Sequence, residues 1–244
     1  MKKIHREKFK VRSSEVDQRR KATLPSIINY IQEAAWNHAY KLGYSVYDLR
    51  EKGITWFLYR LGLEIIDYPD HLSIVEVETW PSGSDKYYCY RDFRLFDQFS
   101  KLIGQATSNW LVFNIKERKL IPVPEYLRKQ VPTTENDSLS RISSKLRVNN
   151  IEGIHKEFEV NQHHIDLNGH TNNMYYFQWI AESMNEDILK NQFLSKLDIV
   201  FKSESFAGDK LIVSTGLNED GTYSHRITNT NGKEVILAIS DWHC

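Results

Sequence analysis

Hydrophobic and polar residues alternate from position 4 to position 12, as they do in a strand with one face in the core. From position 24 to position 40 the pattern changes to helical spacing, with apolar side chains at Leu24, Ile27, Ile28, Ile31, Ala34 and Ala35. Thr23 precedes this stretch as a helix cap, and Pro25 falls in the first turn, where proline is tolerated. We therefore expect the chain to open with a strand and one long helix.

Beyond Gly43 the pattern becomes that of strands. Four are expected, at residues 56–66, 72–80, 86–96 and 102–113. A single helix followed by four strands implies an antiparallel sheet that wraps around the helix.

The second half of the chain repeats this order with shorter strands. Its expected elements are a strand at 153–162, a helix at 172–190, and strands at 197–204, 210–217, 222–228 and 234–242. Residues 218–221 and the pair Asn231-Gly232 are suited to hairpin turns between the last strands. Two long helices, each wrapped by a curved antiparallel sheet, make an α+β tandem (double) hot-dog fold, which is the expected fold class.

The two halves also share a register in the sequence itself. Phe9-Lys10-Val11 aligns with Phe158-Glu159-Val160 at a spacing of 149 positions, and no gap is needed from Phe9 to Glu33. The same spacing aligns Asp17 with Asp166, Tyr30 with Trp179, and Glu33 with Glu182. However, Arg19 and Lys21 stand where the second half has Asn168 and His170. A duplicated fold that keeps a titratable cluster in one copy indicates a scaffold half and a working half.

We therefore expect a first domain at residues 1–128, a proline-containing and polar connection at 129–150, and a second domain at 151–244. At 41% hydrophobic and 12% aromatic residues, the chain has ample material for packed cores. The 32 basic and 32 acidic residues cancel, so the composition gives no broad electrostatic case for nucleic acid as a partner.

Cysteine content and hydropathy argue against disulfide-rich, secreted and membrane-spanning classes of protein. The two cysteines, Cys89 and Cys244, provide neither a disulfide framework nor a thiol-rich metal site. The N-terminus lacks the apolar core of a signal peptide, and the longest apolar runs are too short to cross a bilayer. We expect no membrane span and a cytoplasmic location.

The most chemically suggestive stretch contains Asp166, Asn168 and His170, which alternate and would share one side of an extended segment. They precede a helix expected to begin near Asn172, whose first main-chain amides could bind developing negative charge. Carboxylate, amide and imidazole beside oriented donors are the parts needed for acyl transfer to water. The bland alternative is that Asp166 and Asn168 only form a turn or cap the helix.

Other chemistries find less support in the sequence. His163, His164 and His170 are close in sequence, but adjacent histidines on a strand face opposite ways and no cysteine is nearby, so no metal site is expected. The chain has no glycine-rich phosphate loop and no Gly-x-Ser-x-Gly nucleophile elbow. We expect no cofactor.

At these residues the chain resembles the acyl-acyl-carrier-protein thioesterases, the fatty-acid-releasing enzymes of plant plastids and their bacterial relatives. The match rests on the run Asp-Leu-Asn-Gly-His-Thr-Asn-Asn at 166–173, followed by Tyr176 and Trp179. The first half is also similar, through Val16-Asp17, the helix after it and the aromatic strands that end at Trp110. The transit segment of the plant members is absent from this sequence, which fits a bacterial cytoplasmic protein.

The resemblance implies a second catalytic element after the helix, an acidic residue commonly followed by cysteine. The matching residues here are Glu204 and Ser205, so a cysteine nucleophile is not expected. The implied catalytic residues are Asp166, Asn168, His170 and Glu204. Glu204 would act as general base for water, directly or through His170, while Asn168 and a helix-end amide polarise the carbonyl.

The role of Asp166 stays open at this point: it orients its neighbours, shares the base role, or attacks directly through a mixed anhydride. The implied reaction is hydrolysis of a fatty acyl thioester on acyl carrier protein in fatty acid biosynthesis, with a non-catalytic acyl-chain pocket in the first domain. Carrier protein is acidic as a class, so Arg19-Arg20-Lys21 or Arg118-Lys119 are candidates for docking it.

Three alternatives remain: an acyl-CoA thioesterase of the same fold, a hot-dog hydratase or dehydratase, and a non-catalytic acyl-binding module. Because two fused hot-dog units already form the pair that single-unit relatives build by dimerising, a monomer is viable. A homodimer is the other open assembly.

Overall fold

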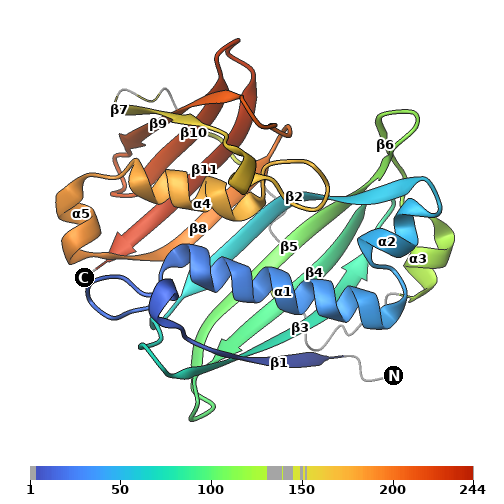
Figure 1. Ribbon diagram of the computed structural model, residues 1–244, viewed down its shortest axis with the longest axis horizontal. Coiled ribbons are helices and arrows are strands. Elements are labelled where there is room, and N and C mark those ends of the chain that lie inside the picture. Colours follow the sequence, from blue (N-terminus) through green and yellow to red (C-terminus); the bar gives the residue numbers. More distant parts are fainter. Residues whose placement is uncertain (1–3, 131–138, 140–144, 149–150, 152, 244) are drawn as a thin grey trace. The chain divides into compact units, whose positions relative to one another are not determined.

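The computed structural model of the chain describes residues 4–130, 139, 145–148, 151 and 153–243 (Figure 1). It divides into two compact units, Met1–Ile142 and Ser143–Cys244. Most of the expected connection at 129–150 lies outside the described residues, as does Cys244.

The first unit is one helix lying across an antiparallel sheet (Figure 1). Its strands are β1 (His5–Lys10), β2 (Ile54–Ile65), β3 (Ile74–Ser84), β4 (Tyr88–Phe96), β5 (Leu102–Asn114) and β6 (Lys119–Ile121). They follow the order β1-β3-β4-β5-β2, with β6 paired to β5. All the strands expected from the pattern are confirmed, and the added β6 is only three residues long.

Helix α1 (Leu24–Leu42) confirms the expected long helix and its cap. The Thr23 hydroxyl accepts a hydrogen bond from the amide of Ser26, and Gly43 ends the helix in the left-handed region at φ 74°. The pattern did not predict the short elements η1 (Ser13–Glu15), α2 (Val46–Arg50) and α3 (Glu125–Gln130). Such single-turn segments have too few residues to show a period.

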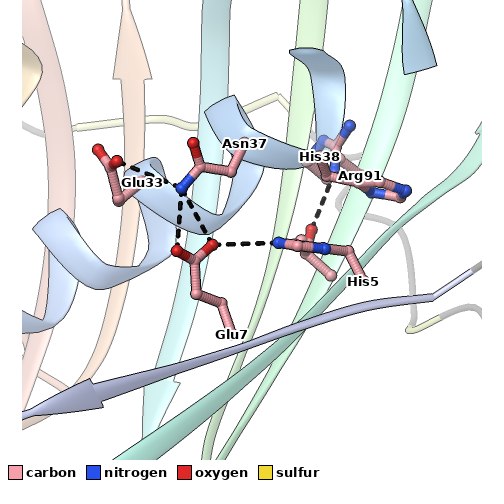
Figure 2. A network of polar contacts seen from close by, with 7 residues as sticks. His5, Glu7, Glu33, Asn37, His38 and Arg91 are labelled. Atoms are coloured by element: carbon pink, nitrogen blue, oxygen red, sulfur yellow. Dashed lines mark hydrogen bonds and ion pairs between the residues drawn. The ribbon is translucent and has the colours of Figure 1, made fainter. Parts of the chain in front are cut away.

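Polar side chains fasten α1 to the sheet of its own unit (Figure 2). The buried Arg91 of β4 contacts His38 of α1, with Nη1 3.1 Å from Nδ1, and His5 of β1 stacks on the His38 ring at 5.3 Å. Asn37 donates to Glu7 at 2.9 Å. Burial, reinforced by Arg91, lowers the pKa of His38 to about 3. The imidazole is therefore neutral near pH 7 and accepts the guanidinium N–H.

The second unit has the same plan. Its strands are β7 (Ile154–Glu159), β8 (Phe193–Phe201), β9 (Lys210–Leu217), β10 (Tyr223–Asn229) and β11 (Glu234–His243), in the order β8-β11-β10-β9-β7. Helix α4 (Asn173–Glu182) lies across this sheet and buries Tyr176, Phe177, Trp179 and Ile180 (Figure 1). A 3-10 turn, η2 (Gln162–His164), precedes it, at the position that η1 has in the first unit.

The expected helix at 172–190 is wrong in its length, because it is broken after Glu182. The buried hydroxyl of Ser183 donates to the carbonyl of Ile180 at 2.7 Å, which closes the last turn. A separate helix, α5 (Glu186–Asn191), then begins with Asn185, whose side chain accepts from the Asp187 amide.

The expected strand at 197–204 is also displaced, since β8 ends at Phe201. The amides of Lys202 and Ser203 both point to the carbonyl of Val235, at 2.8 and 3.4 Å, so the ladder with β11 stops there. Glu204 therefore lies in the connection after the strand and not on it. No helix in the described part of the chain is long and apolar enough to cross a membrane.

Candidate active site

Three of the candidate residues, Asp166, Asn168 and His170, lie in a turn that runs from Ile165 to Thr171. The amide of Asp166 donates to the carbonyl of His170 at 2.8 Å, and Gly169 donates back to the carbonyl of Asp166 at 3.0 Å. The Asp166 carboxylate accepts the amides of Asn168 at 2.7 Å and His170 at 3.3 Å through Oδ1. The segment is therefore a turn, as the alternative interpretation had it, and not extended, because this carboxylate draws the following amides toward itself. Gly169, at φ +81°, provides the left-handed residue that the turn requires.

Asp166 also fixes the orientation of the Asn168 side chain. Asn168 Nδ2 donates to Asp166 Oδ2 at 3.2 Å, an arrangement that the reversed amide would turn into a contact between two oxygens. One N–H of Nδ2 is then left for another acceptor. Oδ1 of Asn168 is buried and has no hydrogen-bond partner within the described residues. A buried oxygen without a partner is costly, so this side chain is prepared to receive a donor from a ligand or water.

Glu204 and His170 meet beside this turn. His170 Nδ1 lies 3.2 Å from Glu204 Oε1, and the two side chains are 32% and 40% exposed. The ring of Phe206 packs edge-on against His170 at 5.2 Å. An imidazole and a carboxylate in contact, both accessible to water, can accept and pass a proton.

Helix α4 begins directly after this turn. Asn172 caps the helix, since its Oδ1 accepts from Met174 N at 3.0 Å, while Tyr175 N donates to the Asn172 carbonyl. Within the described residues, the amide of Asn173 has no hydrogen-bond partner. It is thus an amide of this first turn that the cap leaves open.

The equivalent turn of the first unit has the same main-chain bonds. Asp17 Oδ1 accepts the amides of Arg19 at 2.9 Å and Lys21 at 3.2 Å, and Asp17 N donates to the Lys21 carbonyl at 2.9 Å. Arg20 takes the left-handed conformation, at φ 63°, in the position of Gly169. The register of 149 positions therefore describes a duplicated hydrogen-bond pattern as well as a duplicated sequence.

The side chains of that first turn support no comparable chemistry. Arg19 Nε donates to Asp17 Oδ2 at 2.8 Å, where the second unit has the Asn168 amide. Lys21 Nζ donates to the carbonyl of Tyr68 at 3.0 Å and pairs with Asp70 at 3.1 Å. The acid and the imidazole that meet in the second unit have no counterpart here.

Sequence reasoning identified the residues of this turn but missed those that surround it. Thr171, Tyr176 and Ser205 are buried and joined through their hydroxyls, and Phe206 covers the His170 ring. Ser205 is only 1% exposed, so its hydroxyl is not available to attack a substrate. The signal that could have found two of them is the hydroxyl of Thr171 and of Tyr176, which stand 149 positions after the hydrocarbon side chains of Ala22 and Ile27.

Cysteine and metal chemistry find no support in the described residues. Burial raises the pKa of the Cys89 thiol to about 12, so it is protonated and unreactive near pH 7. Across the described ranges, no group of three or more His, Cys, Asp or Glu side chains is arranged to hold a metal ion.

Two family models match the two units of the chain. The model of the acyl-ACP thioesterase N-terminal domain matches residues 2–131, and that of the C-terminal domain matches residues 148–244. An acyl-[acyl-carrier-protein] hydrolase of Cuphea viscosissima is 26% identical over 98% of this chain, which spans 62% of that relative's length. An oleoyl-acyl carrier protein thioesterase of Coriandrum sativum is 30% identical over 93% of this chain and 67% of its own.

Solved structures show the same fold over the whole chain. An acyl-ACP thioesterase from Bacteroides thetaiotaomicron has a TM-score of 0.87 at 22% identity and covers 99% of this chain and 98% of its own. The 12:0-ACP thioesterase from Umbellularia californica has a TM-score of 0.84 at 22% identity, with 98% and 97% covered. The expected tandem hot-dog fold is confirmed. With both halves matched in order by the family's two domain models, the chain belongs to the acyl-ACP thioesterase family.

Proposed function

We propose that this protein hydrolyses the thioester between a fatty acyl group and the phosphopantetheine of acyl carrier protein, releasing free fatty acid in fatty acid biosynthesis. The observation that carries the proposal is the contact of His170 Nδ1 with Glu204 Oε1 at 3.2 Å, in a chain of this family. An acid and an imidazole within hydrogen-bond distance are suited to activate a water molecule.

In the proposed reaction, water attacks the thioester carbonyl while Glu204 removes its proton, directly or through His170. The carbon–sulfur bond then breaks, and the pantetheine sulfur leaves as a thiol after taking up a proton from the protonated base. No cofactor enters this scheme. The exposure of both side chains supports it, because the attacking water must reach them.

Asn168 and the amide of Asn173 are proposed to stabilise the negative charge that develops on the carbonyl oxygen. The second N–H of Asn168 Nδ2 and the open amide of Asn173 are the available donors near the turn. Asp166 is proposed to hold the Asn168 amide in this orientation. Direct attack by Asp166 is disfavoured, since both its oxygens already accept hydrogen bonds within the turn.

We assign the chemistry to the second domain, residues 151–244, and the acyl-chain pocket to the first, residues 1–128, joined by the connection at 129–150. For docking the acidic carrier, the exposed Arg20 and Arg118 are the best candidates. Neither forms an ion pair within the described part of the chain, whereas Lys21 and Lys119 are held by Asp70 and Glu117. The proposed location is the cytoplasm.

The decisive experiment is a continuous thiol-release assay with matched panels of acyl carrier proteins and acyl-CoAs. Faster turnover of the carrier-protein panel supports the proposal, and its chain-length profile gives the specificity. Preference for the CoA panel would make the protein an acyl-CoA thioesterase. Hydration of an enoyl thioester without thiol release would make it a hydratase. Tight binding of an acyl carrier with no product would make it a binding module.

A further inference from the structure

Three buried hydroxyl groups are hydrogen-bonded to one another next to the residues that carry the acid and the imidazole. Ser205 Oγ is 2.7 Å from Thr171 Oγ1 and 2.8 Å from Tyr176 OH, and the three residues are 1%, 4% and 2% exposed. Two of them come from the loops that carry His170 and Glu204, and Tyr176 comes from helix α4. We call Thr171, Tyr176 and Ser205 the hydroxyl cluster.

The hydrogen bonds of the hydroxyl cluster can all be satisfied at once. Thr171 Oγ1 donates to the Ser205 carbonyl at 3.1 Å, which leaves Ser205 Oγ to donate to Thr171 Oγ1 and Tyr176 OH to donate to Ser205 Oγ. Burial raises the pKa of Tyr176, so its phenol keeps the proton that this arrangement needs. A completed buried network of this kind favours one geometry over others.

Two members of the hydroxyl cluster directly follow the acid–imidazole pair in the chain: Thr171 follows His170, and Ser205 follows Glu204. Thr171 and Ser205 are joined by the main-chain bond Thr171 N to Ser205 O at 2.9 Å and by both hydroxyl contacts. Since His170 and Glu204 immediately precede these two residues, the separation of the pair is set by how firmly the two loops are held together.

The first unit supplies an internal comparison. It keeps the equivalent main-chain bond, from Ala22 N to Pro69 O at 2.8 Å, so this bond belongs to the duplicated fold. Yet its side chains there are hydrocarbon: Ala22 and Ile27 are 149 positions before Thr171 and Tyr176, and Pro69 stands at the place of Ser205. The hydroxyl cluster occurs in the unit that has the acid–imidazole pair and not in its copy.

We propose that Thr171, Tyr176 and Ser205 are positioning residues, whose hydroxyl cluster holds Glu204 within hydrogen-bond distance of His170. The inference rests on the proposed function, because the pair it positions is the proposed proton-transfer machinery. Ser205 contacts neither the substrate nor water in this role, and it acts only through the loop of Glu204.

The test compares Ser205→Ala and Tyr176→Phe with Ser183→Ala as a matched control. Ser183 is another fully buried hydroxyl of the same unit, bonded to Thr215 Oγ1 at 2.6 Å and to the Ile180 carbonyl. All three variants should lose some thermal stability. Only Ser205→Ala and Tyr176→Phe should lower kcat, by about tenfold or more, with KM little changed, since displacement of a reacting group by about 1 Å can cost 100-fold. Their pH–rate profiles should shift, while that of Ser183→Ala should not.

A second readout does not depend on turnover. In protein labelled with 15N-histidine, the imidazole Nδ1 proton of His170, assigned by its disappearance in His170→Gln, should give a hydrogen-bonded signal in the native protein at low temperature. It should be lost in Ser205→Ala and retained in Thr171→Ser, which keeps the hydroxyl. Wild-type kcat, pH profile and proton signal in both Ser205→Ala and Tyr176→Phe would overturn the positioning role. Failure of the native enzyme to release thiol from either substrate panel would instead overturn the proposed function, while the proton signal would still report on the hydroxyl cluster.

Discussion

Glu15 and His164, 149 positions apart, each accept a hydrogen bond from the main-chain amide three residues earlier. Glu15 Oε2 accepts the amide of Arg12 at 2.7 Å, and His164 Nδ1 accepts the amide of Asn161 at 3.0 Å. Burial, with a contribution from His163, lowers the pKa of His164, which keeps the imidazole neutral and its nitrogen able to accept. The duplicated fold is therefore preserved in its hydrogen bonds even where the chemical group has changed.

That equivalence allows the structural and chemical roles of Asp166 to be separated. Asp17→Ala and Asp166→Ala each remove a carboxylate that accepts two main-chain amides and binds one side chain, that of Arg19 or of Asn168. Each should lower the free energy of unfolding by about 1–3 kcal/mol. Only Asp166→Ala should abolish thiol release, because only that turn carries Asn168 and His170. Urea unfolding and the thiol-release assay measure the two effects, and equal activity of both variants would remove Asp166 from the mechanism.

Replacement of Glu204 by glutamine tests the general base. The amide of Glu204→Gln can still contact His170 but cannot take a proton, so kcat should fall by about 100- to 10,000-fold with the fold retained. Glu186→Gln is the matched control, since Glu186 is an exposed carboxylate of the same unit that pairs with Lys190 at 3.0 Å. The comparison is made by steady-state kinetics and circular dichroism. A kcat for Glu204→Gln within threefold of the control would rule out the assigned role.

Each turn has one left-handed residue, Gly169 or Arg20. Replacing the glycine should destabilise the protein, whereas introducing a glycine at Arg20 should not. A Cβ at Gly169 would meet no atom within 4 Å, so Gly169→Ala should cost only the conformational penalty at φ +81°, about 1 kcal/mol. Arg20 already has that penalty at φ 63°, so Arg20→Gly should be neutral or stabilising by up to about 1 kcal/mol. Thermal unfolding of both variants checks this, and destabilisation by Arg20→Gly would show that its side chain contributes more than the backbone costs.

The periodic elements were predictable from the sequence and the short ones were not. The long apolar stripe after Thr23 and the alternation in β9 determined their elements within two residues. The second long helix was overextended, because Ser183 and Asn185, which end one helix and start the next, interrupt an otherwise continuous polar and apolar pattern. A single capping side chain outweighs periodicity at such a junction.

The candidate site was likewise predicted only in part. The duplicated register and the family resemblance led to Asp166, Asn168, His170 and Glu204, and the contact of the last two was expected from the resemblance. The shape of the turn was not, since alternation alone cannot reveal that Asp166 accepts the amides two and four residues ahead. The hydroxyl cluster joins residues up to 34 positions apart, which no local pattern reports.

The pH dependence of folding should reveal a histidine that catalysis does not use. His225 of β10 is fully buried between Thr215 Oγ1 at 2.9 Å and Ser240 Oγ at 2.7 Å, and burial lowers its pKa from 6.5 to about 3. Below pH 6.5 the unfolded chain binds a proton there, whereas the folded chain does not until near pH 3. Acidification over this window therefore favours unfolding, by about 2 kcal/mol for this histidine between pH 6.5 and 5.

His225→Gln should remove this contribution while leaving every other titrating group in place. The variant will be less stable at both pH values because two buried hydroxyls lose a partner, so the informative quantity is the difference between pH 7 and pH 5. That difference, measured by hydrogen exchange of the β10 amides, should shrink by about 2 kcal/mol relative to the wild type. His38→Gln is the matched variant: His38 has a similarly lowered pKa but lies in the first unit, so β10 exchange should keep its wild-type pH dependence. An unchanged slope in His225→Gln would mean that His225 is already protonated in the folded protein at pH 5, with Thr215 and Ser240 both acting as acceptors.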